Sequence, residues 1–422
     1  MIELKYLWNL AVKNLSRNKL RSSISIAAIA ISVCMVVMIR GFMLGILDSM
    51  VTLHIQYNSG HIKIVDQDYQ KKERLLSLNH PVDGFSGEGV QKMADKLKEI
   101  PGIERVIQRL KFGAAASYED KLIGMMGWGV KPADELAFTD IENQLVEGRM
   151  VKEGYKEVVL GTDLLKKLNL KVGDKITLFY TTAFGSFKGT TFEIVGRIES
   201  GLKLLDEIVF YIPLDQAQRI LNMPDQVTEL LLVTQDYRKV DSILPQVKEL
   251  FAAEDPEGRY LVIPWDKSND IIAGLKIAEK IYNIIYVLLI VLASFVVINT
   301  MIMIVKERTQ EIGMMSALGL MKRDILFMFI MEGTVMGILG SLIGVIFGGV
   351  GVKILSIVGI DYTEALSGME AEVLLKPILY PVFTIENLIF SFVLGVTVTA
   401  VTCIIPARKA AQLEPNEALR AL

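Results

Sequence analysis

Four long apolar stretches constrain the fold of this chain more than any other feature of its sequence. They occupy residues 22–47, 281–305, 325–352 and 387–405. A helix needs about 20 predominantly apolar residues to cross the hydrocarbon core of a membrane, and each stretch is close to or above that length. We therefore predict four transmembrane helices. The apolar content of 51% and the mean hydropathy of +0.40 exclude a purely soluble enzyme, a disordered chain and a β-barrel.

The first stretch allows two interpretations, a signal peptide or a membrane anchor. Its uncharged core, residues 22–39, is longer than the apolar region of a usual signal peptide, and no A-x-A-like cleavage site follows it. We interpret it as an uncleaved anchor.

The orientation of the helices follows from lysine and arginine in short segments, which favour the cytoplasmic side. There are five in residues 1–21, four in residues 306–324 and three in residues 406–422, whereas the short segment 359–384 has only Lys376. The sequence thus predicts a cell inner (cytoplasmic) membrane protein with both termini in the cytoplasm. Because the chain changes side at each span, residues 48–280 then lie outside the cytoplasm, and residues 353–386 form a short external loop.

Residues 48–280 have the composition of a large folded α/β domain. Residues 60–65, 190–199 and 207–212 are typical of strands, and residues 89–100 and 215–221 of helices, with Asp215 as the N-cap of the latter. Residues 158–180 predict a strand, a helix, a Gly173-Asp174 turn and a second strand. An inserted subdomain is expected near residues 115–225. We expect the acidic side chains of this domain to be solvated surface, since such residues are mostly exposed.

The sequence lacks the patterns of a catalytic or metal-binding protein. It contains no G-x-x-x-x-G-K-[ST] phosphate loop, no H-E-x-x-H and no G-x-S-x-G. The two cysteines lie in apolar stretches and the three histidines are scattered, so we predict no metal site and no disulfide framework. A net charge of −3 gives no sign of a nucleic-acid partner. The chain is predicted to be non-catalytic and to bind no cofactor.

Only Arg40 and Glu332 are ionisable within the four stretches. Residues of this kind are candidates for a functional site by default. The alternative is that both lie near a helix end and reach interfacial water.

Three further segments indicate helix contacts with partners or lipid. Residues 1–21 predict an amphipathic helix in the cytoplasmic interface, serving as an anchor or as a lever. Residues 306–324 predict a short cytoplasmic helix whose apolar residues Met314, Met315 and Leu318 suit a docking groove on another protein. The third stretch carries a glycine stripe whose spacing allows close helix packing, either within this chain or at a seam between subunits; it comprises Gly333, Gly337, Gly340, Gly344 and Gly348.

Several motifs together resemble a known family. These are AVKNLSRNKLRS at residues 11–22, GTDLLKKLNLKVGDKITL at 161–178, VKERTQEIGMMSALGLMKRDI at 305–325 and PARKAAQLEPNEALRAL at 406–422. In this order they resemble the FtsX-like, MacB-type (type VII) ABC transporter permeases. The length and organisation are most similar to the lipoprotein-releasing LolC/LolE group.

The resemblance implies a fold and a set of partners. The fold is an α-helical membrane protein with four transmembrane helices plus a large α/β extracytoplasmic domain, a MacB-like periplasmic core, between helices 1 and 2. The partners are cytoplasmic ABC ATPase subunits that hold ATP and Mg, a second permease, identical or paralogous, and lipoprotein cargo with a periplasmic carrier. The loop at 306–324 corresponds to the family's coupling helix. Its ATPase-contacting residues would be Glu307, Arg308, Glu311, Gly313, Met314, Met315, Ala317, Leu318 and Gly319.

An acylated cargo needs an apolar pocket, which we predict between the outer halves of the first two spans. Its lining would be Met35, Met38, Phe42, Met43, Ile46, Ile281, Ile285 and Leu288. Methionine adapts its shape and suits variable acyl chains; ordinary lipid-facing or core packing is the alternative. Lipoprotein extraction is the expected function. MacB-like efflux of peptides or drugs, FtsX-like regulation of a cell-wall hydrolase and a membrane-anchored enzyme or adhesin remain as alternatives, although an anchor needs one span rather than four.

Overall fold

A computed structural model describes residues 19–118, 121–268, 270–363 and 376–413 of the 422-residue chain. They form two compact units. One comprises the chain up to Leu47 with Leu275–Asp361 and the part from Ile378 onward, and the other comprises Asp48–Gly274 with Tyr362–Pro377. Residues 1–18 of the N-terminal helix predicted for residues 1–21, and residues 414–422 of the predicted tail, lie outside the described residues, while residues 19–21 belong to the first long helix.

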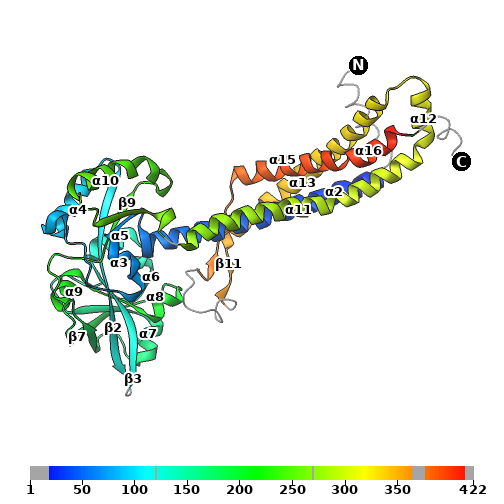
Figure 1. Cartoon of the computed structure of the whole chain (residues 1–422). Coiled ribbons are helices and arrows are strands. Elements are labelled where there is room, and N and C mark those ends of the chain that lie inside the picture. Colours follow the sequence, from blue (N-terminus) through cyan, green and yellow to red (C-terminus); the bar gives the residue numbers. More distant parts are fainter. Residues whose placement is uncertain (1–18, 119–120, 269, 364–375, 414–422) are drawn as a thin grey trace. The chain divides into compact units, whose positions relative to one another are not determined.

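The first unit is built of long helices that lie side by side (Figure 1). The helices are α2 (Lys19–His54), α11 (Asp270–Glu307), α13 (Lys322–Val358) and α15 (Ile385–Thr402), with the shorter α12 (Thr309–Ala317) and α16 (Ile404–Ala411). The short strands β11 (Ile360–Asp361) and β12 (Ile378–Leu379) pair between α13 and α15. Four helices among the described residues are long and apolar enough to cross a membrane, which confirms the fold expected from the four stretches.

The long helices continue beyond the apolar stretches that predict them. For example, α2 runs to His54 and passes into a π-helical turn, Ile55–Ser59, although the apolar stretch ends at residue 47. Hydropathy identifies only the segment of a helix that is apolar enough to lie in lipid. The helical backbone hydrogen bonds continue beyond that segment until a residue such as Gly60 ends the helix. A packed apolar core joins the helices, contributed mainly by Val33, Val36, Val37, Tyr286, Val297, Met301, Phe329, Met336, Cys403 and Ala407.

The second unit is an α/β domain around one ten-stranded mixed sheet. Its strands are β1 (Ile62–Asp66), β2 (Ile103–Tyr118), β3 (Lys121–Val130), β4 (Leu145–Gly148), β5 (Glu157–Gly161), β6 (Lys175–Thr181), β7 (Phe187–Ile198), β8 (Val209–Pro213), β9 (Glu229–Thr234) and β10 (Tyr260–Pro264). The order is β10-β1-β9-β2-β3-β8-β5-β7-β4, and β6 pairs with β2 and β7. Most neighbours are antiparallel, but β3 with β8 and β5 with β7 are parallel.

The helices of this unit cover the sheet because their apolar sides match its buried residues. They are α3 (Gln67–Lys71), α4 (Val90–Lys98), α5 (Pro132–Phe138), α6 (Ile141–Gln144), α7 (Thr162–Leu168), α8 (Lys203–Glu207), α9 (Leu214–Leu221) and α10 (Val240–Glu254). Strands β5, β8 and β9 are buried along their whole length, as expected for strands covered on both faces. Strand β6 alternates, with Ile176, Leu178 and Tyr180 inward.

The strands and helices predicted for this unit are confirmed, with one correction at Asp215. The N-cap of α9 is Pro213 and makes no side-chain cap bond. The Asp215 carboxylate instead accepts hydrogen bonds from the Gly154 backbone at 3.1 Å and from the Gln216 amide at 2.7 Å. The strands in residues 115–225 join the same sheet as the rest of the unit.

Candidate functional site

The segment between α11 and α13 forms a short helical corner. Helix α11 ends at Glu307, and the Arg308 side chain donates from Nε to Glu311 Oε2 at 2.8 Å across the first turn of α12. The Glu307 carboxylate also forms an ion pair with Arg21 near the start of α2. These contacts connect the end of α11 with the start of α12 and with the first helix.

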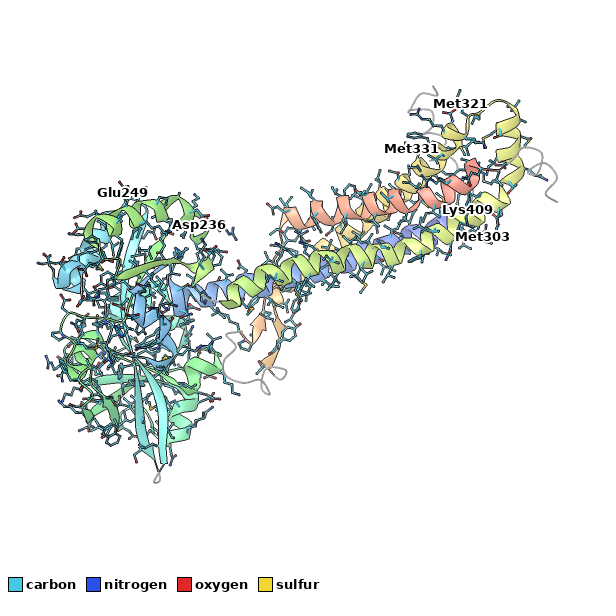
Figure 2. All side chains as sticks on the ribbon, viewed as in Figure 1. Asp236, Glu249, Met303, Met321, Met331 and Lys409 are labelled. Atoms are coloured by element: carbon cyan, nitrogen blue, oxygen red, sulfur yellow. The ribbon has the colours of Figure 1, made fainter. Side chains whose placement is uncertain are left out.

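Helix α12 has a buried side and an exposed apolar side. Ile312 and Gly313 face the helical core and Met315 is partly buried against it. Met314 and Leu318, one turn apart, are 51% and 85% exposed, and the adjoining Ala317 and Gly319 are exposed too. Met321, which is 72% exposed, lies just before α13 at the same end of the helical unit (Figure 2). We name Met314, Leu318 and Met321 the corner patch.

The corner differs in two ways from the single helix predicted for residues 306–324. The helix covers only Thr309–Ala317, because Gly319, with a φ of +98°, ends it and turns the chain into α13. Met315 faces inward with Ile312, so it does not share the exposed side of Met314 and Leu318.

The glycine stripe of α13 packs against two different helices of this chain. A Cβ atom added to Gly344 would lie 2.5 Å from the carbonyl oxygen of Ala30, and one added to Gly340 would lie 2.7 Å from Ile29 Cβ, both on α2. Gly348 approaches the same helix at Val37 (2.9 Å). Gly333 and Gly337 instead meet Cys403 and Thr399 at the C-terminal end of α15. Because glycine has no side chain, the backbone of α13 can approach α2 and α15 closely at these positions.

The eight residues predicted to line an acyl pocket do not gather around one hollow. Ile281, Ile285 and Leu288 lie on an exposed face of α11. The face of α11 that meets α2 instead carries Tyr282 and Tyr286, and the hollow there measures only about 10 Å³. That is room for about one water molecule and not for an acyl chain. Of the eight, Met43 lines this small hollow, while Met38, Phe42 and Ile46 are half-buried on α2.

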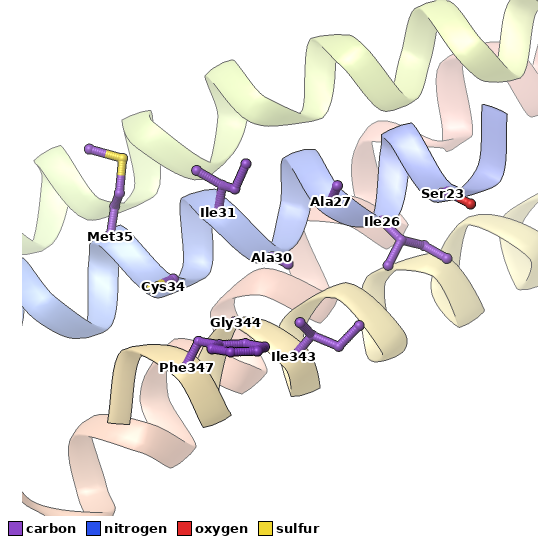
Figure 3. Close-up of a pocket in the computed structure, with 10 residues that line it drawn as sticks. All are labelled: Ser23, Ile26, Ala27, Ala30, Ile31, Cys34, Met35, Ile343, Gly344 and Phe347. Carbon is purple, nitrogen blue, oxygen red and sulfur yellow. The ribbon is translucent and has the colours of Figure 1, made fainter. Parts of the chain in front are cut away.

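A larger apolar hollow lies between α2 and α13, where Met35 is one of the lining residues. Its volume is about 540 Å³. Figure 3 shows the residues that line it. The lining is Ser23, Ile26, Ala27, Ala30, Ile31, Cys34, Met35, Ile343, Gly344 and Phe347. The close approach of the helices at Gly344 forms one wall. The prediction missed this hollow because it paired the first span with the second rather than with the third.

The two ionisable residues of the spans both pack inside the helical unit. The Arg40 guanidinium lies 3.7 Å from the centre of the Phe390 ring on α15. Glu332 is buried, at 1% exposed, in the N-terminal half of α13. This burial argues against the alternative that the Glu332 side chain reaches interfacial water.

The α/β unit contains buried charges that the sequence signals only weakly. Arg109 on β2 forms a two-bond ion pair with Glu135 on α5, through Nε at 3.1 Å and Nη2 at 2.6 Å, and both side chains are fully buried. Glu229 on β9 pairs with Lys111 at 2.8 Å and with Lys63 at 3.3 Å. Glu135 and Glu229 therefore contradict the expectation that acidic residues here are solvated.

The pKa of Glu229 follows from these neighbours. Burial opposes its charge, but the ammonium groups of Lys111 and Lys63 outweigh burial and hold the pKa of this carboxyl below its usual value. In the sequence, the only sign of these buried charges is that charged residues occur inside otherwise apolar strands.

Comparison with known proteins identifies the family. Residues 22–250, more than half of the chain, match the MacB-like periplasmic core domain. Residues 283–415 match the FtsX-like permease C-terminal domain. The chain belongs to the FtsX-like ABC transporter permeases with a MacB-like core domain.

The permease is similar to lipoprotein-releasing and export proteins at modest identity. It is 26% identical over 313 residues to the lipoprotein-releasing system transmembrane protein LolC of Xylella fastidiosa, covering 69% of this chain and 72% of LolC. It is 27% identical over 348 residues to the LolE counterpart of Haemophilus influenzae, with 78% and 80% covered. It is 23% identical over 409 residues to the macrolide export ATP-binding/permease protein MacB of Brucella melitensis, with 91% and 57% covered.

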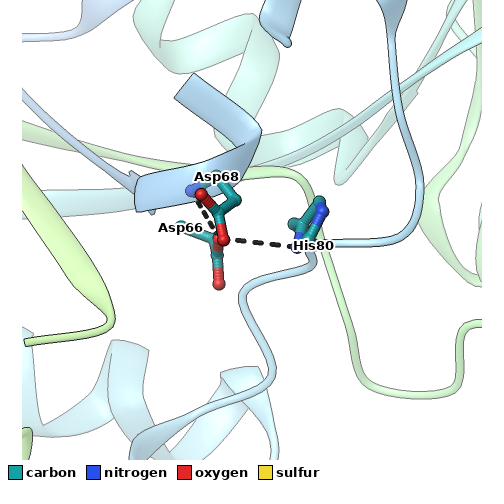
Figure 4. Close-up of side chains that lie close together, drawn as sticks. All are labelled: Asp66, Asp68 and His80. Carbon is teal, nitrogen blue, oxygen red and sulfur yellow. Dashed lines mark hydrogen bonds and ion pairs between the residues drawn. The ribbon is translucent and has the colours of Figure 1, made fainter. Parts of the chain in front are cut away.

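One group of side chains in the permease has the composition of a metal site but the bonding of a helix cap. Asp66, Asp68 and His80 bring their ligand atoms within 4.8 Å of one another (Figure 4). Asp66 Oδ1 accepts from the backbone N–H groups of Asp68 and Tyr69, as an N-cap residue does, and Oδ2 accepts from Arg259 at 3.0 Å. Asp68 pairs with Lys71 at 2.9 Å. The two carboxylates thus already have positive or N–H partners.

Acid is expected to weaken the permease's α/β unit at His61. Its Nδ1 accepts the Thr234 N–H at 2.9 Å, and burial lowers the pKa of His61 from 6.5 to about 4. The unfolded chain therefore binds more protons in this window. The free energy of unfolding should fall as pH drops from 6.5 towards 4, by up to about 3 kcal/mol at about 1.4 kcal/mol per pKa unit. Denaturant unfolding in detergent at a series of pH values, followed by tryptophan fluorescence, measures this. Burial also lowers the pKa of His54 to about 4, so His54 contributes in the same pH window. His61→Gln should therefore remove the His61 part of the slope and leave the His54 part, and an unchanged profile in this variant would contradict the assignment to His61.

Proposed function

We propose that this permease extracts lipoproteins from the outer leaflet of the cytoplasmic membrane and is driven by a separate ABC ATPase. The observation that carries the proposal is the corner patch, an exposed apolar surface at the turn between two membrane helices. Monomeric soluble surfaces rarely present such side chains together unless a partner covers them. The ATPase subunits, which hold ATP and Mg, dock on this corner from the cytoplasm, and the α/β unit lies on the opposite side of the membrane.

The corner is suited to transmitting a conformational change because it packs against the neighbouring membrane helices. Ile312 is buried in the core that α11 and α13 share, and the Arg21–Glu307 ion pair connects the corner to α2. A push on Leu318 therefore acts on stiff packed helices rather than on a loose loop. A second permease, identical or paralogous, completes the transporter, and a soluble carrier receives the cargo outside.

Lipoprotein is the favoured cargo for two reasons. The relatives LolC and LolE are named for lipoprotein release. The hollow between α2 and α13 is almost entirely apolar and has room for part of an acyl chain. MacB-like efflux is the second candidate, favoured by the 91% of this chain that aligns with MacB.

The experiment that separates these candidates uses the permease reconstituted with its ATPase and partner permease in proteoliposomes. We expect a triacylated lipoprotein to accelerate ATP hydrolysis and to appear on an added carrier only when ATP is present. Stimulation by a macrolide or peptide, with indifference to lipoprotein, would favour export instead.

Filling the hollow should block the acyl chain. Ala27 lines it and is exposed, so Ala27→Trp occupies the space without disturbing the helix core. We expect crosslinking of a photoreactive acyl chain to the permease to fall by about tenfold, the effect of losing roughly 1.4 kcal/mol of binding. Leu288→Trp on the exposed face of α11 is the matched control and should leave crosslinking unchanged. The reverse result would place the acyl chain on α11, as the sequence predicts.

A further inference from the structure

A second and larger hollow lies wholly within the α/β unit. Its volume is about 750 Å³, within the range of roughly 300–1,000 Å³ that is usual for ligand sites. Residues 70–76 form one wall, residues 266–268 another, and Lys111 and Trp128 of the central strands line it as well. Unlike the hollow between α2 and α13, it has polar and apolar surface in similar amounts.

The charges around this hollow are unbalanced. Lys72, Arg74 and Lys267 line it and make no ion pair with any residue that the structure describes. The lining has five cations in all, with Lys71 and Lys111, and two carboxylates, so its net charge is positive. Of the carboxylates, Glu73 is already paired with Lys63, and Asp266 also has an interaction partner. Three cations without a partner around one concave surface create a positive potential that favours an anion.

Trp128, another residue of the lining, carries a hydrogen-bond donor without a partner among the described residues. The side chain is only 3% exposed, and its Nε1 has no hydrogen-bond partner among the described residues. A buried donor without an acceptor is unfavourable, and an oxygen atom of a ligand could accept this hydrogen bond. The indole ring packs edge-on against Tyr211, with 5.5 Å between ring centres, so its position is fixed.

The lining of the hollow also includes an exposed apolar side chain, and some of its residues are adjacent in sequence to two of the candidate membrane helices. Leu75, which is 77% exposed, stands beside Arg74 in the lining. Tyr57 and Asn58 belong to the end of the candidate membrane helix Lys19–Ser59, and Ser268 comes two residues before α11. A ligand that is both anionic and apolar and that resides in a membrane suits this combination.

We propose that the hollow lined by Lys72, Arg74, Lys267 and Trp128 binds the headgroup of an anionic phospholipid. The cations hold the phosphate, the indole N–H donates to one of its oxygens, and Leu75 contacts the start of the acyl region. The site is separate from the acyl hollow between α2 and α13, and its occupation does not depend on which cargo the transporter carries.

Calorimetric titration of the full-length protein in neutral detergent micelles tests the site. The probes are dihexanoylphosphatidylglycerol, dihexanoylphosphatidylcholine and inorganic phosphate. We expect the phosphatidylglycerol to bind, the phosphatidylcholine not to bind, and phosphate to bind far more weakly. The affinity for phosphatidylglycerol should fall with added salt, since it rests on charge.

Variants locate the binding. Lys72→Gln with Arg74→Gln should weaken phosphatidylglycerol binding by about tenfold or more. Lys175→Gln with Lys188→Gln removes the same charge from exposed positions on β6 and β7 and should have no effect. Trp128→Phe keeps an aromatic ring but removes the N–H and should also weaken binding.

Three results would overturn the proposal. Equal binding of phosphatidylcholine would show that charge plays no part. Phosphate binding as tightly as phosphatidylglycerol would make the ligand a free anion rather than a lipid. Unchanged affinity in the Lys72→Gln, Arg74→Gln protein would place the lipid elsewhere on the molecule.

Discussion

Leu318→Asp should abolish ATP-driven release of cargo while the permease stays folded. Leu318 is 85% exposed at the end of α12, so the substitution removes no core contact. If the ATPase covers this side chain, a buried carboxylate replaces an apolar anchor at the centre of the interface. Truncating such an anchor costs about 2–4 kcal/mol, and an unpaired buried charge adds to the loss. We therefore expect the affinity for the ATPase to fall by at least about thirtyfold. Co-purification with the ATPase and carrier-dependent release measure the two effects.

The control for this variant is Leu122→Asp. Leu122 on β3 is 67% exposed and lies in the α/β unit, so the same change of side chain is made at a similar exposure. It should leave ATPase binding intact. Normal ATPase binding and normal cargo release by the Leu318→Asp protein would show that the corner patch is not the surface on which the ATPase docks.

Gly344→Ala should destabilise the helical unit even though alanine is the better helix former. The added Cβ would lie 2.5 Å from the Ala30 carbonyl oxygen, and this atom belongs to the backbone of α2 and has little freedom to move. The two helices must separate, and overpacking of this kind costs about 1–3 kcal/mol. The fraction of SDS at which the helical unit unfolds in mixed micelles measures the change.

Gly351→Ala on the same helix is the matched control. There the added Cβ would lie 3.6 Å from the Met38 sulfur, an ordinary contact with a flexible side chain. The gain in helix propensity of up to about 1 kcal/mol should then appear as unchanged or higher stability. If both variants behave alike, the stripe does not set the distance between α13 and α2.

The sequence was sufficient to predict the four membrane helices and most elements of the α/β unit. Each depends on a local signal, namely a long apolar run or an alternating strand such as β6. The helix boundaries were less predictable. Gly319 ends α12 through a left-handed backbone conformation, and nothing in the apolar pattern of residues 306–324 marks that position.

The candidate sites depended on which helices and strands lie next to one another, and periodicity does not specify neighbours. Ile281 and Leu288 share an apolar helix face with the expected spacing, yet the face of α11 that meets α2 is the one with Tyr282 and Tyr286. Glu229 appears in the sequence as one acidic residue among many. Only the pairing of β9 with β1 and β2 brings Lys63 and Lys111 to its carboxylate.

In the proposed mechanism, a nucleotide-driven push on α12 moves the α/β unit on the other side of the membrane. The most direct test is the distance between spin labels at Lys188→Cys in the two permeases of the reconstituted complex, in a Cys34→Ala background, with and without ATP. We expect ATP to change this distance in the complex with native Leu318 and to leave it unchanged when Leu318→Asp is added. A distance that does not respond to ATP, or that responds equally in both proteins, would contradict it.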